Sequence, residues 1–209
     1  MAHSALNSTL AIIILAGGSS SRLGQAKQLV KVQNETLIAK QCHLALSVTS
    51  HVYVVVGCQA QVIAHSIEHL PVHIVNNLDW QLGMGSSITH GIKALPNHIT
   101  AVMLLLVDQW QLTPKLLNTF VQAWRRAPEK IHCATKTQDN VQGPPVIFPY
   151  TYFRTLSEQK PSSGAKRLLK KHMHSVISLP LDEAFVDLDT PKQLAQCLNY
   201  YQTMNSDLA

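Results

Sequence analysis

The sequence lacks several features that would place it in a specialised class of protein. Its 209 residues include only four cysteines, and these form no Cys-x-x-Cys pair: Cys42, Cys58, Cys133 and Cys197. We therefore expect reduced, mostly buried thiols instead of a zinc site or a disulfide framework. No apolar run approaches the roughly 20 residues that cross a bilayer, and the first nine residues contain no cleavable apolar segment. These absences lead us to expect a soluble, cytoplasmic protein with no membrane partner.

Charged and aromatic residues are also sparse. Charged residues make up 14% of the chain and aromatic residues 6%, while the formal net charge is +5. A positive charge could suit nucleic acid, but the basic residues are scattered and are not interleaved with aromatic side chains. We therefore expect no nucleic-acid partner, because a small anionic substrate accounts for the excess charge equally well.

Short β-rich runs alternate with amphipathic helical patterns along the whole chain. This alternation predicts an α/β fold with a mostly parallel central sheet flanked by helices on both faces. No linker divides the sequence, so we expect one domain over residues 1–209, with halves at about 10–110 and 111–200. The patterns predict strands at 12–15, 51–56, 72–75, 101–107, 131–137, 146–148, 176–179 and 185–188. Those at 131–137 and 146–148 are expected to be antiparallel additions, separated by a polar loop that contains residues 143–145. Thr36 and Thr113 are expected to cap two of the helices.

The chain is organised around residues 12–27, where an apolar run ends in Gly17 and Gly18. Bare backbone at the two glycines lets main-chain N–H groups point into a concavity that suits an anion. Arg22 offers a planar fork for phosphate oxygens, and Lys27 offers a mobile point charge. A solvated Gly-Ser turn is the alternative, but open α/β sheets bind ligands where such a strand ends. The loop matches neither the Walker A pattern nor the Gly-x-Gly-x-x-Gly pattern.

Three aspartates are candidates for a metal site. Asp108 follows the strand predicted at 101–107, and parallel strands would bring it to the same sheet edge as the glycine loop. Mg²⁺ prefers one or two carboxylates together with substrate phosphates. Asp187 and Asp189 are two residues apart in a segment expected to be extended, so both can face one site. The alternatives are a turn beginning at Asp108 and help from one late aspartate in capping the last helix.

Residues 15–27 resemble the signature Leu-Ala-(Ala/Gly)-Gly-x-x-x-Arg-(Met/Leu)-Gly-x-x-Lys of the nucleotidyltransferases of molybdenum cofactor type. Further motifs follow in the expected order, so the resemblance covers about residues 11–200. It implies a Rossmann-like, single-domain nucleotidyltransferase fold of the GT-A type. It also implies nucleotide contacts from the loop residues Leu15, Ala16, Gly17, Gly18, Ser19, Arg22 and Lys27.

The same resemblance extends to the metal site. Residues 105–110 are similar to the family's Leu-x-x-Asp-Gln-Pro motif, except that Trp110 stands where proline is usual. Because of this difference, the resemblance does not predict the shape of the acceptor pocket. Residues 186–191 are similar to its late Asp-(Ile/Val)-Asp-Thr-Pro motif. The resemblance implies Mg²⁺ on Asp108 and Asp189, with Asp187 as a supporting carboxylate.

Residues 77–87 resemble the Asn-Pro-Asp-Trp…Gly-Met-Gly-Ser-Ser segment of the cytidylyltransferase branch, with Leu78 in place of proline. The implied nucleotide contacts are Asn77, Trp80, Gly83, Gly85, Ser86 and Ser87. Two later elements resemble the acceptor-binding motifs Gly-x-Pro-x-x-Phe and Gly-Ala-(Arg/Lys). They imply acceptor contacts from Gly143, Pro144, Pro145, Gly164, Ala165 and Lys166.

Together these motifs imply the transfer of CMP from CTP to the terminal phosphate of molybdenum cofactor, with release of pyrophosphate. Arg22, Lys27 and Asp108 would be the catalytic residues, and a client molybdoenzyme would be a further partner. Gly17 matches the guanylyltransferase form of the first motif, so GTP is the nearest alternative. A nucleotidyltransferase acting on a sugar or polyol phosphate and a non-catalytic nucleotide-binding cofactor chaperone are the others, because fold alone does not fix the substrate.

Overall fold

The apolar run near the start of the chain forms the centre of a seven-stranded sheet in the computed structural model, which describes residues 9–206. Strand β1 (Leu10–Ala16) is buried along its whole length. It pairs in parallel with β4 (Val52–Val56) on one side and with β6 (Ala101–Leu106) on the other. Strand β5 (His73–Asn76) continues the parallel pairing beyond β4. The parallel half of the sheet is therefore as predicted.

The second half of the sheet mixes directions, and the strand order is β5-β4-β1-β6-β8-β7-β9. Strand β8 (Gln142–Pro149) is antiparallel to β6 and to β7 (Ile131–Thr135), while β9 (Val176–Pro180) is parallel to β7. We predicted a loop around residues 143–145, and this is wrong because β8 begins at Gln142. A β-bulge beside Cys133 and Ala134 accommodates the two prolines, which cannot donate ladder hydrogen bonds.

The strand predicted at 185–188 is also wrong. A short 3₁₀ helix, η6 (Asp182–Phe185), is followed by an irregular segment that leads into α7 (Pro191–Ser206). Polar groups of this segment bond to side chains and not to a neighbouring strand. The Ala184 carbonyl accepts a hydrogen bond from Gln109, and the Asp189 amide donates one to Gln193.

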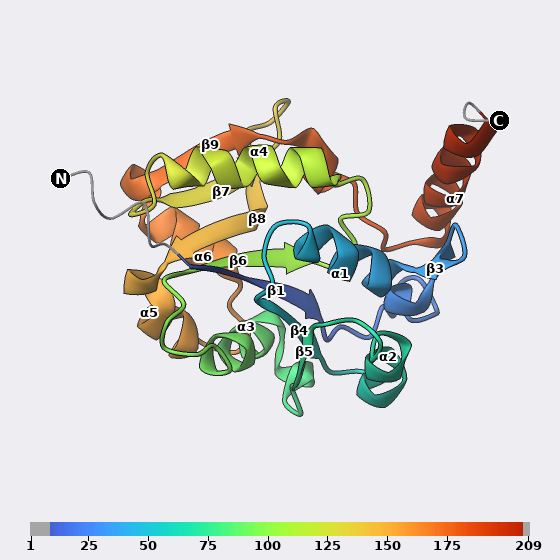
Figure 1. Cartoon of the computed structure of the whole chain (residues 1–209), viewed down its shortest axis with the longest axis horizontal. Helices are drawn as coiled ribbons and strands as arrows, with labels where there is room; N and C mark the ends of the chain where they lie inside the picture. The colour runs from blue at the N-terminus through green and yellow to red at the C-terminus, as the bar shows by residue number, and fades with distance from the viewer. Residues whose placement is uncertain (1–8, 207–209) are drawn as a thin grey trace.

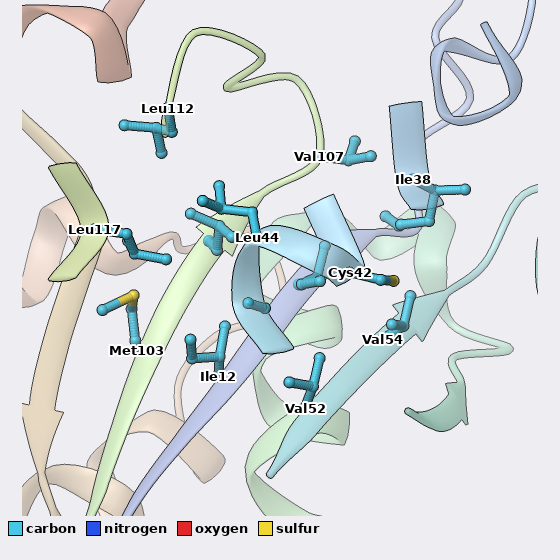
Figure 2. Close-up of a cluster of buried hydrophobic side chains, with 14 of the residues drawn as sticks. Ile12, Ile38, Cys42, Leu44, Val52, Val54, Met103, Val107, Leu112 and Leu117 are labelled. Carbon is cyan, nitrogen blue, oxygen red and sulfur yellow. The ribbon is translucent and has the colours of Figure 1, made fainter. Parts of the chain in front are cut away.

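Helices cover both faces of the sheet, as predicted (Figure 1). On one face, α1 (Leu37–Leu46), α2 (Ala60–Ser66) and α4 (Pro114–Arg125) pack on the side chains of Ile12, Val54 and Met103. Figure 2 shows the centre of this cluster, with Ile38, Cys42 and Leu44 of α1 and Leu117 of α4 above the strands.

On the other face, α3 (Met84–Lys93), α5 (Phe153–Ser157) and α6 (Ala165–Lys171) pack on Ile13, Leu15 and their neighbours. Successive residues of β1 thus contribute to opposite clusters, as the two-residue period of a strand requires. The predicted caps form, because Thr36 accepts a hydrogen bond from the Ala39 amide and Thr113 accepts one from the Leu116 amide.

A third, smaller cluster joins α7 to the two-stranded hairpin of β2 (Lys31–Val32) and β3 (Glu35–Thr36), and Figure 1 shows α7 beside β3. Trp110 lies in this cluster, with its ring against Tyr200 and Tyr201. The remaining elements are 3₁₀ helices: η2 (Lys27–Leu29), η3 (Trp80–Leu82), η4 (Tyr150–Tyr152) and η5 (Met173–Ser175). Among residues 9–206, no helix is long and apolar enough to span a membrane.

Candidate functional site

A pocket of about 330 Å³ lies where β1 and β6 end. Three stretches that are distant in the sequence meet there, because parallel neighbouring strands place their carboxyl ends at one edge of the sheet. The pocket is lined by Leu15, Gly17, Gly18, Ser19, Lys27, Gln28, Trp80, Gln81, Gly83, Met84, Ser87, Leu106, Val107 and Asp108. Eight of the predicted nucleotide contacts and the predicted catalytic Asp108 are therefore in one cavity.

The glycine loop is held in shape by Gln28, a residue that we did not predict. Its side chain is 1% exposed, and Nε2 donates hydrogen bonds to the carbonyl oxygens of Ala16 (2.7 Å) and Gly18 (2.9 Å). Ser20, in the left-handed region at φ 54°, donates to Gln28 Oε1 and accepts from the Lys27 amide. With these two carbonyls bonded to Gln28, neither is free to turn toward an anion in the pocket.

Four charged side chains meet at the edge of this pocket. Lys27 Nζ lies 2.5 Å from Asp108 Oδ2 and 2.7 Å from Asp189 Oδ1. Arg22 Nη2 lies 2.7 Å from the other oxygen of Asp189, although the Arg22 side chain is 73% exposed. The structure thus joins the first, middle and last of the predicted motifs through one ammonium group.

The electrostatics follow from this arrangement. Burial by itself would lower the pKa of Lys27, but the neighbouring Asp108 and Asp189 outweigh it and raise that pKa. Burial by itself would raise the pKa of Asp189, but Lys27 and Arg22 hold it below its usual value. Asp187 makes no such pair. Burial and the charges of Asp108 and Asp189 raise its pKa to about 6.

The residues present fit a divalent cation. Asp108 Oδ1 is buried and has no hydrogen-bond partner in the described part of the chain, and a bound cation would satisfy it. Asp108 and Asp189 both contact the ammonium group of Lys27, so one small cation in its place could contact both carboxylates. Carboxylate oxygens are ligands that Mg²⁺ prefers. Over residues 9–206, however, no group of three or more His, Cys, Asp or Glu side chains is arranged to hold a metal. The fit is therefore to two carboxylates, with Asp187 beside them.

Three of the residues predicted from the segment 77–87 lie outside the pocket lining: Asn77, Gly85 and Ser86. Asn77 is fully buried, and its side chain donates to the hydroxyls of Ser86 and Ser87 while it accepts from the Asp79 amide. It shapes the turn but does not line the pocket, and neither Ser86 nor Gly85 lines it. A Cβ on Gly85 would collide with the carbonyl oxygens of Lys160, Pro161 and Ser163, so this glycine admits a close backbone contact with the 160–163 turn.

The first predicted acceptor element lies within β8, and the second lies at the start of α6, which packs on one face of the sheet. Gly143 faces Phe185, which packs against the cluster beneath α1 and α4. Ala165 is buried in the opposite cluster, and Lys166 is exposed beside it. Gln109 connects the first element to the site, because its side chain donates to the carbonyls of Pro144 (2.7 Å) and Ala184 (2.8 Å).

Comparison with known proteins agrees with this geometry. The sequence profile of the MobA-like NTP transferase domain matches residues 12–176. The chain belongs to this family. The glycine loop and Asp108 therefore lie in an NTP transferase domain, while Asp189 lies beyond the matched residues.

Individual relatives extend over nearly the whole chain. A protein of Trichormus variabilis named a probable molybdenum cofactor guanylyltransferase is 46% identical, with 89% of each chain covered. The purine catabolism protein PucB of Bacillus subtilis is 29% identical, with 87% of this chain and 92% of PucB covered.

Solved structures share the fold at lower identity. A homologue of Rv0371c from Mycobacterium sp. strain JC1 superposes with a TM-score of 0.81 at 23% identity, covering 93% of this chain and 98% of that one. Rv0371c of Mycobacterium tuberculosis, solved as a manganese complex, superposes with a TM-score of 0.76 at 20% identity, covering 92% and 99%. These likenesses confirm the nucleotidyltransferase-type α/β fold.

Proposed function

We propose that this protein transfers CMP from CTP to the terminal phosphate of molybdenum cofactor and releases pyrophosphate. The observation that carries the proposal is the position of Lys27 between Asp108 and Asp189 at the edge of the glycine-loop pocket. Residues 10–110 would hold the nucleotide, and residues 111–200 the acceptor. A cytoplasmic location and delivery of the product to a client molybdoenzyme belong to the same proposal.

In this reaction an oxygen of the acceptor phosphate attacks the α-phosphorus of the nucleotide. The bond from that phosphorus to the bridging oxygen breaks, and its electron pair leaves with pyrophosphate. Both reactants are anions, so the residues of the protein must align them and offset their charge. Lys27 and Arg22 stabilise the charge that grows on the leaving group. The acceptor phosphate is already ionised near neutral pH, so the reaction needs no general base.

Asp108 and Asp189 would hold Mg²⁺, which when bound neutralises phosphate charge as a Lewis acid. In the structure these carboxylates are neutralised by Lys27 and Arg22 instead. A triphosphate offers both cationic side chains alternative oxygen partners. The binding of the triphosphate would therefore free the two carboxylates for the metal. The acceptor would be positioned by the 143–145 segment and by Gly164, Ala165 and Lys166.

The choice of nucleotide has two candidates. Residues 77–87 favour CTP, because they resemble the cytidylyltransferase segment, and Trp80, Gly83 and Ser87 from it line the pocket. GTP is favoured by Gly17, since a Cβ there would lie 3.1 Å from Ser87 Oγ and would narrow the pocket. The name of the Trichormus variabilis relative also favours GTP.

The test is pyrophosphate release from CTP and from GTP, with and without molybdenum cofactor, in the wild type and in Asp108→Ala. We expect turnover with CTP and the cofactor, and a loss of at least about a hundredfold in Asp108→Ala. The matched control is Asp139→Ala, which should retain wild-type turnover. This aspartate is exposed, contacts Lys136 and the Val141 amide, and does not line the pocket.

Each other outcome selects a different function. Turnover with GTP alone would show that GTP, not CTP, is the nucleotide substrate. In that case we expect Gly17→Ala to weaken the binding of GTP more than the binding of CTP. Turnover only with a sugar or polyol phosphate would replace the acceptor. Nucleotide binding without turnover on any acceptor would contradict the enzyme and leave a nucleotide-binding chaperone.

A further inference from the structure

A second pocket of about 330 Å³ lies between α5 and α6, away from the carboxylate pair. Three of the residues that line it are cationic: Lys160, Arg167 and Lys171. None of the residues lining the nucleotide pocket lines this one. We call it the Arg167 pocket.

The charge of the Arg167 pocket is not balanced within the described part of the chain. Its single carboxylate, Glu158, accepts a hydrogen bond from Arg154 Nε at 3.0 Å and is thereby paired outside the cationic group. Arg167 and Lys171 are four residues apart on α6, so they share one face of the helix. Like charges at this spacing repel each other. An anion between them would relieve that repulsion.

An unpaired donor adds a second, independent observation. Gln159 also lines the Arg167 pocket, and its Nε2 atom is buried without a hydrogen-bond partner among residues 9–206. A buried polar group with no partner costs free energy, so native proteins rarely leave one unexplained. An oxygen of a bound anion would accept this hydrogen bond, and Ser163 contributes a hydroxyl to the same wall.

The Arg167 pocket is separate from the nucleotide pocket but shares a structural element with it. The 160–163 turn presents its carbonyl oxygens to α3, where Pro161 accepts a hydrogen bond from the Ser86 amide at 3.2 Å. Lys160 and Ser163 of the same turn line the Arg167 pocket. The 160–163 turn therefore contacts Gly83 and Ser86 near the nucleotide pocket and also lines the Arg167 pocket.

We propose that the Arg167 pocket is a second anion-binding site, for a small phosphate or diphosphate group. The guanidinium of Arg167 matches the geometry of phosphate oxygens, and the two ammonium groups add point charges. The volume is near the lower end of the roughly 300–1,000 Å³ that ligand pockets span, which suits a small anion. This site is independent of the choice between CTP and GTP.

The experiment titrates the full-length protein with inorganic pyrophosphate and, separately, with inorganic phosphate. Binding is followed by calorimetry and by amide chemical shifts of residues 155–171. We expect Arg167→Ala and Lys171→Ala each to weaken binding about tenfold or more, because each removes a charge-assisted contact. Lys170→Ala is the matched control, since it removes the same charge from an exposed position of α6 that does not line the pocket. It should change binding by less than about twofold.

Lys27→Ala separates the two pockets, because it removes a cation from the nucleotide site alone. Shifts at residues 155–171 that survive in Lys27→Ala and disappear in Arg167→Ala support the proposal. Equal losses in Arg167→Ala and Lys170→Ala would show that only general surface charge attracts the anion, and would overturn it. Binding that vanishes in Lys27→Ala would place the anion in the nucleotide pocket and would also overturn it. A response to pyrophosphate without a response to phosphate would assign the site to diphosphates.

Discussion

Lys27 and Asp108 form a short ion pair, with Nζ 2.5 Å from Oδ2, across 81 positions of the sequence. The side chains are only 13% and 10% exposed, so little water screens the two charges. The pair connects the loop after β1 to the end of β6. Removing Lys27 leaves the Asp108 carboxylate buried without a cationic partner, which is the costly way to break such a pair. Removing Asp108 leaves Lys27 with Asp189 as its partner.

We expect Lys27→Met to lower the free energy of unfolding by about 3 kcal/mol, because it leaves the buried Asp108 carboxylate without a cation. Asp108→Asn should cost less, because Lys27 keeps Asp189 as a partner. The double variant should lose less than the sum of the single losses, because neither charge remains to be compensated. Urea denaturation of the four proteins in the absence of divalent cations measures this. Strictly additive losses would contradict the coupling.

Gln28 should control nucleotide affinity through the shape of the loop. In Gln28→Leu the carbonyls of Ala16 and Gly18 lose their donor and are free to turn toward the phosphates. We expect nucleotide dissociation constants to rise about tenfold, which matches the loss of one to two hydrogen bonds. Gln122→Leu, at an exposed position of α4, is the control. Calorimetric titration with CTP and GTP measures the effect, and equal affinities in all three proteins would contradict this role.

The parts of the fold that were predicted correctly are those whose signal is local. The run that forms β1 is apolar at nearly every position, and Thr36 precedes a helical pattern with a residue suited to capping. Gly17 and Gly18 after that strand were sufficient to predict the loop. Asp108 and Asp189 were predicted to face one site from topology and resemblance, and both contact Lys27.

The parts that were missed depend on partners distant in the sequence. Nothing near Gln28 shows that its amide will bond to two carbonyls of the preceding loop. The prolines at 144 and 145 indicate a loop locally, yet a bulge beside Cys133 accommodates them in β8. Nothing near Asn77 in the sequence shows that its amide will bond to the hydroxyls of Ser86 and Ser87. In each case tertiary hydrogen bonds outweigh the local pattern.

Gly85 should be required for the contact between α3 and the 160–163 turn. An added Cβ would meet the carbonyl oxygens of Lys160 and Ser163 and would lie 2.7 Å from that of Pro161. We expect Gly85→Ala to lower the free energy of unfolding by about 1–3 kcal/mol, as overpacking does. Gly18→Ala is the matched control, because a Cβ there would meet no atom within 4 Å. Thermal unfolding checks this, and similar losses in both variants would argue against a specific contact.

His132 should make the stability of the protein depend on pH. Its side chain is 1% exposed within β7, and burial lowers its pKa below the usual value, although a hydrogen bond to the Lys130 carbonyl and the charge of Glu129 oppose the shift. His132 therefore binds a proton less readily in the folded state than in the unfolded state. The contribution of His132 to stability is therefore fully present above about pH 6.5, the ordinary histidine pKa, and declines as the pH falls below that value.

Replacing this side chain with His132→Asn removes the titrating group, while the amide can still donate to the Lys130 carbonyl. We expect the fall in melting temperature between pH 7.5 and pH 5.5 to be smaller in His132→Asn than in the wild type, whatever the two proteins' stabilities at pH 7.5. His69→Gln, at an exposed position beyond α2, should keep the wild-type slope. An unchanged slope in His132→Asn would mean that other groups govern the acid sensitivity, because the linkage relation ties the slope to protons bound on unfolding.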